Sequence, residues 1–164
     1  GAKPVFYTCD EQSDWHPDVE DIRRKLTART RAILIINPNN PTGQVTDRPL
    51  MEKILEICRE KGIFLFIDEC FLDLTLGGGD ISMKPFLEEY DGLFLLKAFT
   101  KSYGMAGIRL GYCLCADREL LKAMSLERLH PRPGGRHCGI GGRGLCQEGQ
   151  RPDPQPAAPD GTSP

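Results

Sequence analysis

Apolar and polar positions along residues 3–126 form a repeated alternation of continuous apolar runs and amphipathic segments. The runs at 31–36 and 63–67 are apolar almost throughout, which is typical of parallel strands buried on both faces. Between these runs, apolar residues recur at helical spacing and a Lys-Gly pair then ends the pattern: Leu50, Met51, Ile54, Leu55, Cys58 and Lys61-Gly62. This order predicts a strand, a helix and a second strand.

The rest of the alternation extends the same interpretation. We expect a short strand at 5–9, a helix at 16–26, a short helix at 84–90, strands at 93–96 and 108–115, and a helix from Asp117. The helix at 16–26 has a proline and acidic residues in its first turn, where the free N–H groups and the helix dipole favour them. Strands that alternate with helices in this way predict an α/β fold, with a mostly parallel sheet flanked by helices on both faces.

The chain changes character after residue 126. Residues 127–164 contain eight glycines, seven prolines and five arginines but no lysine, and their large aliphatic residues are few: Leu129, Ile140 and Leu145. Such a segment cannot bury enough apolar surface to offset the entropy of ordering it, so we expect disorder. It is either a proline-rich linker or docking tail, or the product of a reading-frame change, and the abrupt switch within a predicted helix favours the second. We therefore place one domain at residues 1–126, followed by this tail.

Composition and charge exclude several classes of protein. The hydrophobic fraction of 40% and net charge of −2 indicate a globular protein without bias toward nucleic acid or acidic membranes. No run is long and apolar enough to span a bilayer, and the first residues lack the features of a signal peptide, so we expect no membrane association and a cytoplasmic location. Seven scattered cysteines predict reduced thiols, and we expect no metal because the tail's histidines and cysteines fit no zinc spacing: His130, His137, Cys138 and Cys146.

Polar residues gather where the predicted strands end. Ligands of open α/β sheets lie beyond the carboxyl ends of the strands, so these positions are the informative ones. Three such points occur, at 37–43, at Asp68-Glu69 and at 97–109. Each of them alone has an ordinary explanation, as turn chemistry, as a solvated strand end or as surface charge. Their combination is what indicates a function.

A pyridoxal-phosphate site needs a specific set of polar groups. A lysine must react with the cofactor's aldehyde, a carboxylate should face the pyridine nitrogen, and an amide suits the phenolate oxygen. The phosphate needs an arginine, backbone amides and hydroxyls. The chain offers Asn40, Asp68, Lys101 and Arg109 in that order, all at or near predicted strand ends. The full set of roles is therefore present.

Three motifs resemble those of class I/II aminotransferases, the fold type I family of pyridoxal-phosphate enzymes. They are NPNNPTG at 37–43, the acidic pair Asp68-Glu69, and KAFTKSYGMAGIRLGY at 97–112. The resemblance implies a partial large domain over residues 1–126, a pyridoxal 5'-phosphate cofactor and a Schiff base on Lys101. It further implies that Asn40 contacts the phenolate oxygen, Asp68 the pyridine nitrogen and Arg109 the phosphate.

Two positions depart from the family pattern. Many members carry a tyrosine where this chain has Phe71, and a phenylalanine cannot donate a hydrogen bond to the phenolate oxygen. Many members also carry serine or threonine at the position of Ala98, which leaves Thr100 as the nearest hydroxyl for the phosphate. The resemblance therefore makes Phe71 and Thr100 part of the expected cofactor site.

The motifs point to more than one branch of the family. Residues 68–73 and 97–112 are most similar to the branch of histidinol-phosphate aminotransferases and threonine-phosphate decarboxylases, whereas residues 7–26 are more similar to alanine-type aminotransferases. We expect an enzyme acting on a small amino acid, by transamination or alternatively by decarboxylation. Intact relatives imply a homodimer. The resemblance covers a central part of the family's chain, so we expect this fragment to be inactive alone, and a remnant that binds no cofactor is the alternative.

Overall fold

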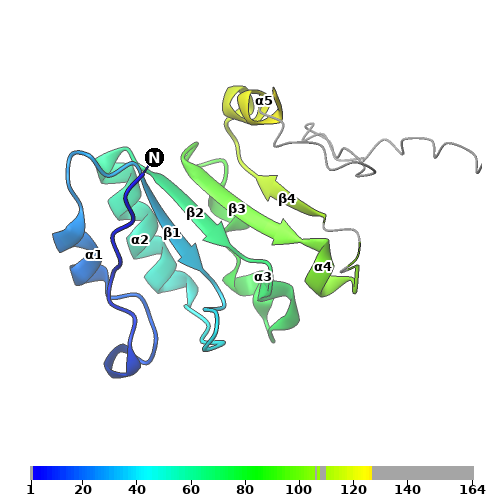
Figure 1. The fold of residues 1–164 in the computed structure, drawn as a ribbon, viewed down its shortest axis with the longest axis horizontal. Helices are drawn as coiled ribbons and strands as arrows, with labels where there is room; N and C mark the ends of the chain where they lie inside the picture. The colour runs from blue at the N-terminus through cyan, green and yellow to red at the C-terminus, as the bar shows by residue number, and fades with distance from the viewer. Residues whose placement is uncertain (1, 106, 108–109, 127–164) are drawn as a thin grey trace, which may run out of the picture.

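A four-stranded sheet forms the centre of the protein, with its strands in the order β1-β2-β3-β4. The computed structural model describes residues 2–105, 107 and 110–126. Strands β1 (Ala32–Ile36), β2 (Phe64–Asp68) and β3 (Leu93–Ala98) pair in parallel, and β4 (Gly111–Leu114) pairs antiparallel with β3 (Figure 1). The predicted α/β class with a mostly parallel sheet is confirmed.

The longer helices form where the sequence predicts them, although the helix expected at 16–26 begins three residues later, at Val19. An aspartate side chain caps the first turn of α1 (Val19–Lys25) and of α2 (Arg48–Lys61), accepting a backbone N–H in each case. Gly62 ends α2 with a φ of 61°, a left-handed conformation that glycine adopts without strain. Helix α5 (Arg118–Leu126) follows β4. The shorter helical segments are α3 (Gly78–Ile81), α4 (Phe99–Ser102) and the 3₁₀ turns Glu11–Ser13, Leu72–Leu74 and Lys84–Phe86.

Two predicted elements are wrong. Residues 5–9 are extended but join no sheet, because the Thr8 N–H and hydroxyl both donate to the Asp21 carboxylate instead of to a strand. The predicted helix at 84–90 is reduced to one 3₁₀ turn. There Tyr90 reaches back to the sheet, and its hydroxyl lies 2.6 Å from the carbonyl oxygen of Ile63. In both segments tertiary contacts outweigh the local pattern.

The main core lies between the sheet and helices α1 and α2. In Figure 1 α2 lies behind the sheet, and every second residue of β1 and β2 faces it. The most deeply buried members of this core come from β1, β2, β3 and α2: Ile35, Met51, Ile54, Leu55, Cys58, Leu65, Ile67, Leu93 and Leu95. These residues hold the strand ends in fixed positions. No helix in the described part of the chain is long and apolar enough to cross a membrane.

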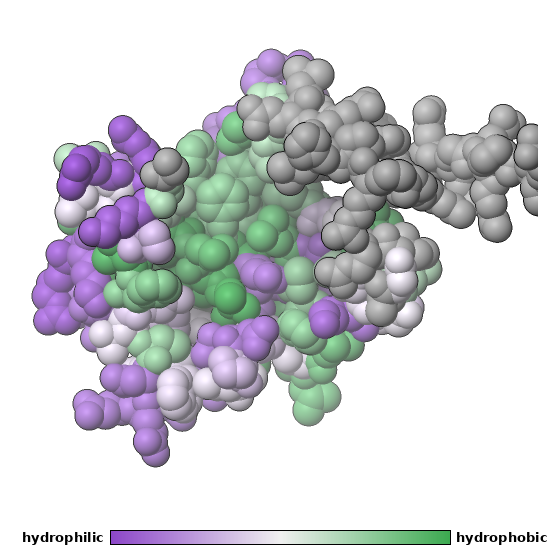
Figure 2. Space-filling model, viewed as in Figure 1, coloured by the Kyte–Doolittle hydropathy of each residue, from purple (hydrophilic) through white to green (hydrophobic). Residues whose placement is uncertain are grey.

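The opposite face of the sheet is apolar and open. Leu34 and Phe64 remain 56% and 39% exposed there, whereas the Phe94 ring, which stacks on Phe66 with centroids 4.7 Å apart, is fully buried. Figure 2 shows hydrophobic residues gathered over the sheet in the middle of this view. Helices on both faces were expected, but within the described residues no helix covers this face over β1 and β2 (Figure 1). We call this surface the open face.

The segment before α1 is attached to that helix by one buried carboxylate. Asp21 is 5% exposed and accepts hydrogen bonds from the Thr8 N–H at 2.7 Å and from Lys25 Nζ at 2.6 Å. Its second oxygen pairs with Arg24 at 3.1 Å. The Lys25 ammonium, and after it the Thr8 and Arg24 donors, lower the pKa of Asp21 against the opposing effect of its burial.

Removing a core side chain should destabilise the protein strongly. We expect Leu65→Ala to lower the free energy of unfolding by about 2–5 kcal/mol, because the fully buried Leu65 leaves a cavity between β2 and the helices. Leu76→Ala is the matched control, since Leu76 is 99% exposed, and its effect should stay within about 0.5 kcal/mol. Urea unfolding followed by circular dichroism measures both, and equal effects would contradict the described core.

Stability should fall in acid because of Asp21. A folded-state pKa below the unfolded value means that the carboxylate stabilises the protein above about pH 4, and that this contribution is lost as the pH falls further. Asp21→Asn should therefore be less stable than the unmodified chain at pH 6, and the difference should shrink toward pH 3. Asp80→Asn, at an exposed position, is the control. A pH-independent difference for Asp21→Asn would overturn the assignment.

Candidate active site at the carboxyl ends of the strands

The loop after β1 is fixed by Asn37, the first residue of the NPNNPTG motif. Asn37 is 2% exposed, and its backbone N–H donates to the carbonyl oxygen of Asp68 at 2.9 Å. Its side chain donates to the carbonyl oxygen of Thr46 and accepts from the Thr46 N–H, both at 2.9 Å. This closes the loop at its base, so that the exposed Asn40 is presented at the same sheet edge as Asp68. Sequence reasoning singled out Asn40 and missed the structural role of Asn37.

Asp68 is the last residue of β2 and lies between two neighbouring strands. It is in register with Ile36 of β1 and Leu96 of β3. Residues alternate between the two faces of a strand, so Asp68 shares the open face with Phe66. Its Oδ1 accepts the Cys70 N–H at 2.9 Å, which orients the half-buried carboxylate. Asp68 is therefore an accessible and oriented acceptor.

Lys101 lies in α4, the short helix that follows β3. Its side chain is exposed, and its Nζ lies 5.0 Å from the centre of the Phe71 ring. Phe71 comes three residues after Asp68 and is 37% exposed. The predicted lysine and Phe71 thus meet beyond the ends of β2 and β3, and the predicted carboxylate Asp68 is the last residue of β2. Within the described residues Lys101 forms no ion pair, so its amine is available to a ligand.

Thr100 and Arg109 are the two residues predicted to bind the cofactor's phosphate. Thr100 is half-buried in α4, next to Lys101. Arg109 lies outside the described residues. The carbonyl oxygen of Leu110 accepts the Phe99 N–H at 3.0 Å, and Gly111 is in register with Ala98. The chain returns to the base of α4 at that point.

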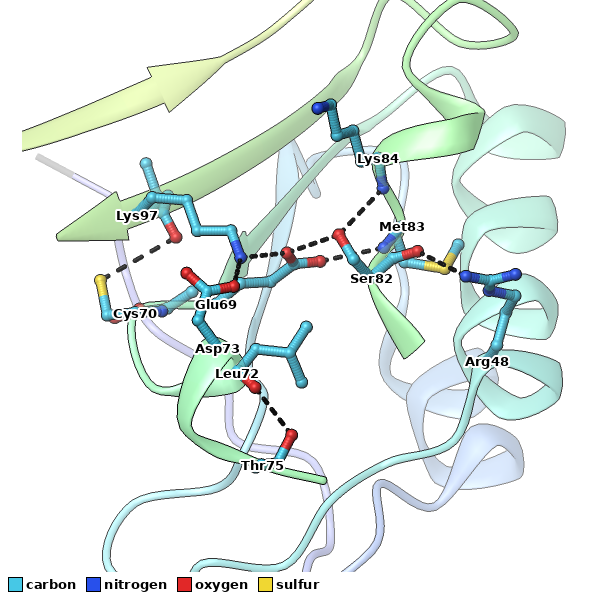
Figure 3. Close-up of polar contacts among 12 residues, drawn as sticks. Arg48, Glu69, Cys70, Leu72, Asp73, Thr75, Ser82, Met83, Lys84 and Lys97 are labelled. Atoms are coloured by element: carbon cyan, nitrogen blue, oxygen red, sulfur yellow. Dashed lines mark hydrogen bonds and ion pairs between the residues drawn. The ribbon is translucent and has the colours of Figure 1, made fainter. Parts of the chain in front are cut away.

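A buried charged network lies beside the site, and sequence reasoning did not identify it (Figure 3). Glu69 is 1% exposed, and its Oε2 lies 3.2 Å from Nζ of Lys97. Lys97 also pairs with Asp73 at 2.8 Å. The alternation of residues along the strands carried the missed signal: Glu69 continues the inward positions of β2, and Lys97 continues those of β3.

The two lysines at the end of β3 differ in character. Burial alone would lower the pKa of Lys97, but the carboxylates of Asp73 and Glu69 outweigh it and raise this pKa above that of an exposed lysine. Lys97 is therefore held as an ammonium ion in two ion pairs. Lys101 is exposed and lies outside these two ion pairs.

Three cysteines of the described chain are held as thiols. Burial, followed by a hydrogen bond to Asp68, raises the pKa of Cys70 to about 12. Burial likewise raises the pKa of Cys58 to about 12 and that of Cys113 to about 11. Because the thiolate is the reactive form, these side chains are poor nucleophiles at neutral pH. Within the described residues, no group of acidic, cysteine and histidine side chains could hold a metal ion.

Comparisons with known proteins agree with this arrangement. The sequence model of the family described as "Aminotransferase class I and II" matches residues 1–128. The chain is 41% identical over 112 residues to glutamate-pyruvate aminotransferase AlaA of Escherichia coli K12, which covers 68% of this chain and 27% of that protein. A probable aspartate/prephenate aminotransferase of Aquifex aeolicus is 39% identical over 119 residues, covering 71% of this chain and 30% of its own length.

Solved structures show the same fold. The histidinol-phosphate aminotransferase from Clostridium acetobutylicum aligns with a TM-score of 0.68 and 31% identity, over 76% of this chain and 36% of that one. The alanine aminotransferase from Pyrococcus furiosus aligns with a TM-score of 0.58 and 36% identity, over 74% of this chain and 31% of that one. Both of the aminotransferase types that the motifs resemble are thus among its relatives.

The match in sequence and the match in fold concern the same part of the chain, which contains the strand ends described above. The chain spans less than a third of the length of the curated relatives named here. The family match nevertheless extends over most of its 164 residues. The chain belongs to the class I and II aminotransferase family.

Proposed function

We propose that this chain contributes the lysine and the ring-binding carboxylate of a pyridoxal-phosphate-dependent aminotransferase that acts on an amino acid. The observation that carries the proposal is the contact of Lys101 with Phe71, which follows Asp68 by three residues; Lys101 Nζ lies 5.0 Å from the centre of the Phe71 ring. An exposed amine and an oriented carboxylate at the same edge of the sheet fit a ligand that offers an aldehyde and a protonated ring nitrogen. The set of side chains therefore suits the cofactor.

Each residue has a separate role in the proposal. When bound, pyridoxal phosphate supplies an electron sink for the bonds to the amino acid's α-carbon. Lys101 binds the aldehyde, and the Asp68 carboxylate keeps the proton on the ring nitrogen. Asn40 donates to the phenolate oxygen, and Thr100 and Arg109 hold the phosphate. Phe71 supplies an apolar surface and no hydrogen bond at its position.

Selectivity for Lys101 follows from the other side chains around it. Lys97 is engaged by two carboxylates, and the neighbouring thiol of Cys70 has a raised pKa. An aldehyde reaching this sheet edge thus meets one accessible amine in the described site. This supports Lys101, and not Lys97, as the residue that binds the cofactor.

Transamination is the reaction that we propose, with a small amino acid as donor. The relatives named above are aminotransferases, and two of them are named as alanine or glutamate-pyruvate aminotransferases. A decarboxylase of the same fold has support from the motifs at 68–73 and 97–112 and from Phe71, which stands where many aminotransferases carry tyrosine. Homodimer formation, as in intact relatives, belongs to the proposal, and so does the division into a domain at 1–126 and a tail at 127–164.

Chemical labelling tests the role of Lys101. The purified chain is mixed with pyridoxal phosphate and reduced with borohydride, and the modified lysines are mapped by mass spectrometry. We expect the label at Lys101, and we expect Lys101→Ala to remove it because no other amine at the site is equally accessible. Lys53→Ala, at an exposed position of α2, is the control and should leave the labelling unchanged. Labelling spread evenly over Lys25, Lys53 and Lys122 would favour a remnant that does not bind the cofactor.

The role of Asp68 has a separate test. Asp68→Asn keeps an oxygen that can accept the Cys70 N–H, so the fold should be preserved, but it removes the charge that faces the ring nitrogen. We expect the affinity for pyridoxal phosphate to fall about tenfold or more, as for the loss of a hydrogen bond to a charged group. Absorbance titration measures the change, with Asp80→Asn as the control. An unchanged affinity would remove Asp68 from the site.

A further inference from the structure

The ion pair between Glu69 and Lys97 is buried and almost fully hydrogen-bonded (Figure 3). The Glu69 carboxylate accepts from Ser82 Oγ at 2.8 Å and from the Met83 N–H at 3.0 Å, in addition to its 3.2 Å contact with Lys97. The Lys97 side chain is 10% exposed and has Asp73 as its second partner at 2.8 Å. Ser82 and the Met83 N–H thus hold the Glu69 carboxylate, and Asp73 holds the Lys97 ammonium, in addition to the ion pair itself.

The pair lies directly behind the proposed site. Glu69 follows Asp68, and Lys97 is the last residue but one of β3, four residues before Lys101. The Glu69 N–H also donates to the carbonyl oxygen of Leu96 at 2.9 Å, so the two strand ends are joined by a backbone bond as well. A movement of Lys97 away from Glu69 would therefore carry the start of α4 away from the end of β2.

The free energy of folding alone does not explain why a charged pair occupies these buried positions. Taking two charges out of water is costly, and well-packed apolar residues at such positions are often equally stable or more so. Breaking such a pair by removing one partner is, in contrast, strongly destabilising. What an ion pair of this kind can add is a defined geometry, because it disfavours alternative packings that leave either charge unpaired.

We propose that Glu69 and Lys97 are positioning residues that hold α4 against the end of β2 and thereby fix the placement of Lys101 relative to Asp68. The pair does not touch the cofactor in this proposal, since it lies on the helix-covered side of the sheet and Asp68 lies on the open face. The function of this positioning rests on the proposed role of Lys101, whereas the ordering of α4 does not.

A matched double variant tests the proposal. Glu69→Gln with Lys97→Met removes both charges at nearly constant volume. The glutamine oxygen can still accept the Met83 N–H, and its amide can donate to Ser82, so no buried backbone donor is left unpaired. Asp73 is half-exposed and gains water in place of Lys97. The control double variant is Arg59→Met with Glu89→Gln. It removes the 2.9 Å ion pair between Arg59 of α2 and Glu89 in the loop before β3.

The first measurement needs no cofactor. Amide hydrogen exchange of the segment 97–104 reports on α4, whose protecting bonds include Phe99 N–H to Leu110 and Tyr103 N–H to Phe99. We expect exchange in this segment to be about tenfold faster in the site double variant than in the unmodified chain, with urea unfolding nearly unchanged. The control pair should leave this segment unchanged. Equal exchange in all three proteins would overturn the proposal.

The second measurement is the share of borohydride label at Lys101. The site double variant should lose most of the selectivity for Lys101. The single variant Lys97→Arg, which keeps Glu69 and the positive charge, should retain this selectivity. Faster exchange without any Lys101 labelling in the unmodified chain would refute the proposed function and leave the ordering of α4 supported. Selective labelling that survives the double variant would refute the positioning role alone.

If the double variant does not fold, a milder variant tests the same proposal. Asp73→Asn removes the charge of the half-exposed carboxylate that pairs with Lys97 and leaves Glu69 with all its partners. Exchange of the segment 97–104 should then rise by a smaller factor in the same direction. Unchanged exchange in Asp73→Asn would count against the proposal.

Discussion

Parallel pairing of β1, β2 and β3 is the constraint on which the site depends. Because these strands run in the same direction, the loops that follow them leave the sheet at one edge, and residues distant in sequence become neighbours there. The hydrogen bond from Asn37 to Asp68 and that from Glu69 to Leu96 continue the pairing one residue beyond the strands. The geometry of the site is thus an extension of the sheet ladder, and the core beneath β2 keeps that ladder in register.

How much could be predicted from the sequence depended on whether the pattern was local. The buried strands, the two longer helices and their caps follow from apolar spacing and from single residues at the ends. The segments 5–9 and 84–90 were misassigned because hydrogen bonds to distant groups decide their conformation. The positions of Asn40, Asp68 and Lys101 at or after strand ends could be predicted from the sequence. The alternation along each strand shows that Glu69 and Lys97 face inward, but their pairing depends on the register between two strands, which no local pattern contains.

The neighbouring residues Asp68 and Glu69 show how one strand end serves two purposes. The alternation of side chains sends the first carboxylate to the open face and the second into the core. The first is half-exposed and is oriented by the Cys70 N–H, and the second is enclosed by donors and a cation. An acidic pair at the end of an apolar strand can therefore combine a ligand-binding group with the group that holds its surroundings.

The open face also governs how the isolated chain behaves in solution. Contiguous apolar surface of this kind is normally found at interfaces, and an uncovered sheet of aromatic and aliphatic side chains attracts other copies of itself as the concentration rises. The exposed Leu34 and Phe64 lie on the same face of the sheet as Asp68. A ligand or protein segment that covers Leu34 and Phe64 would remove this apolar surface from water.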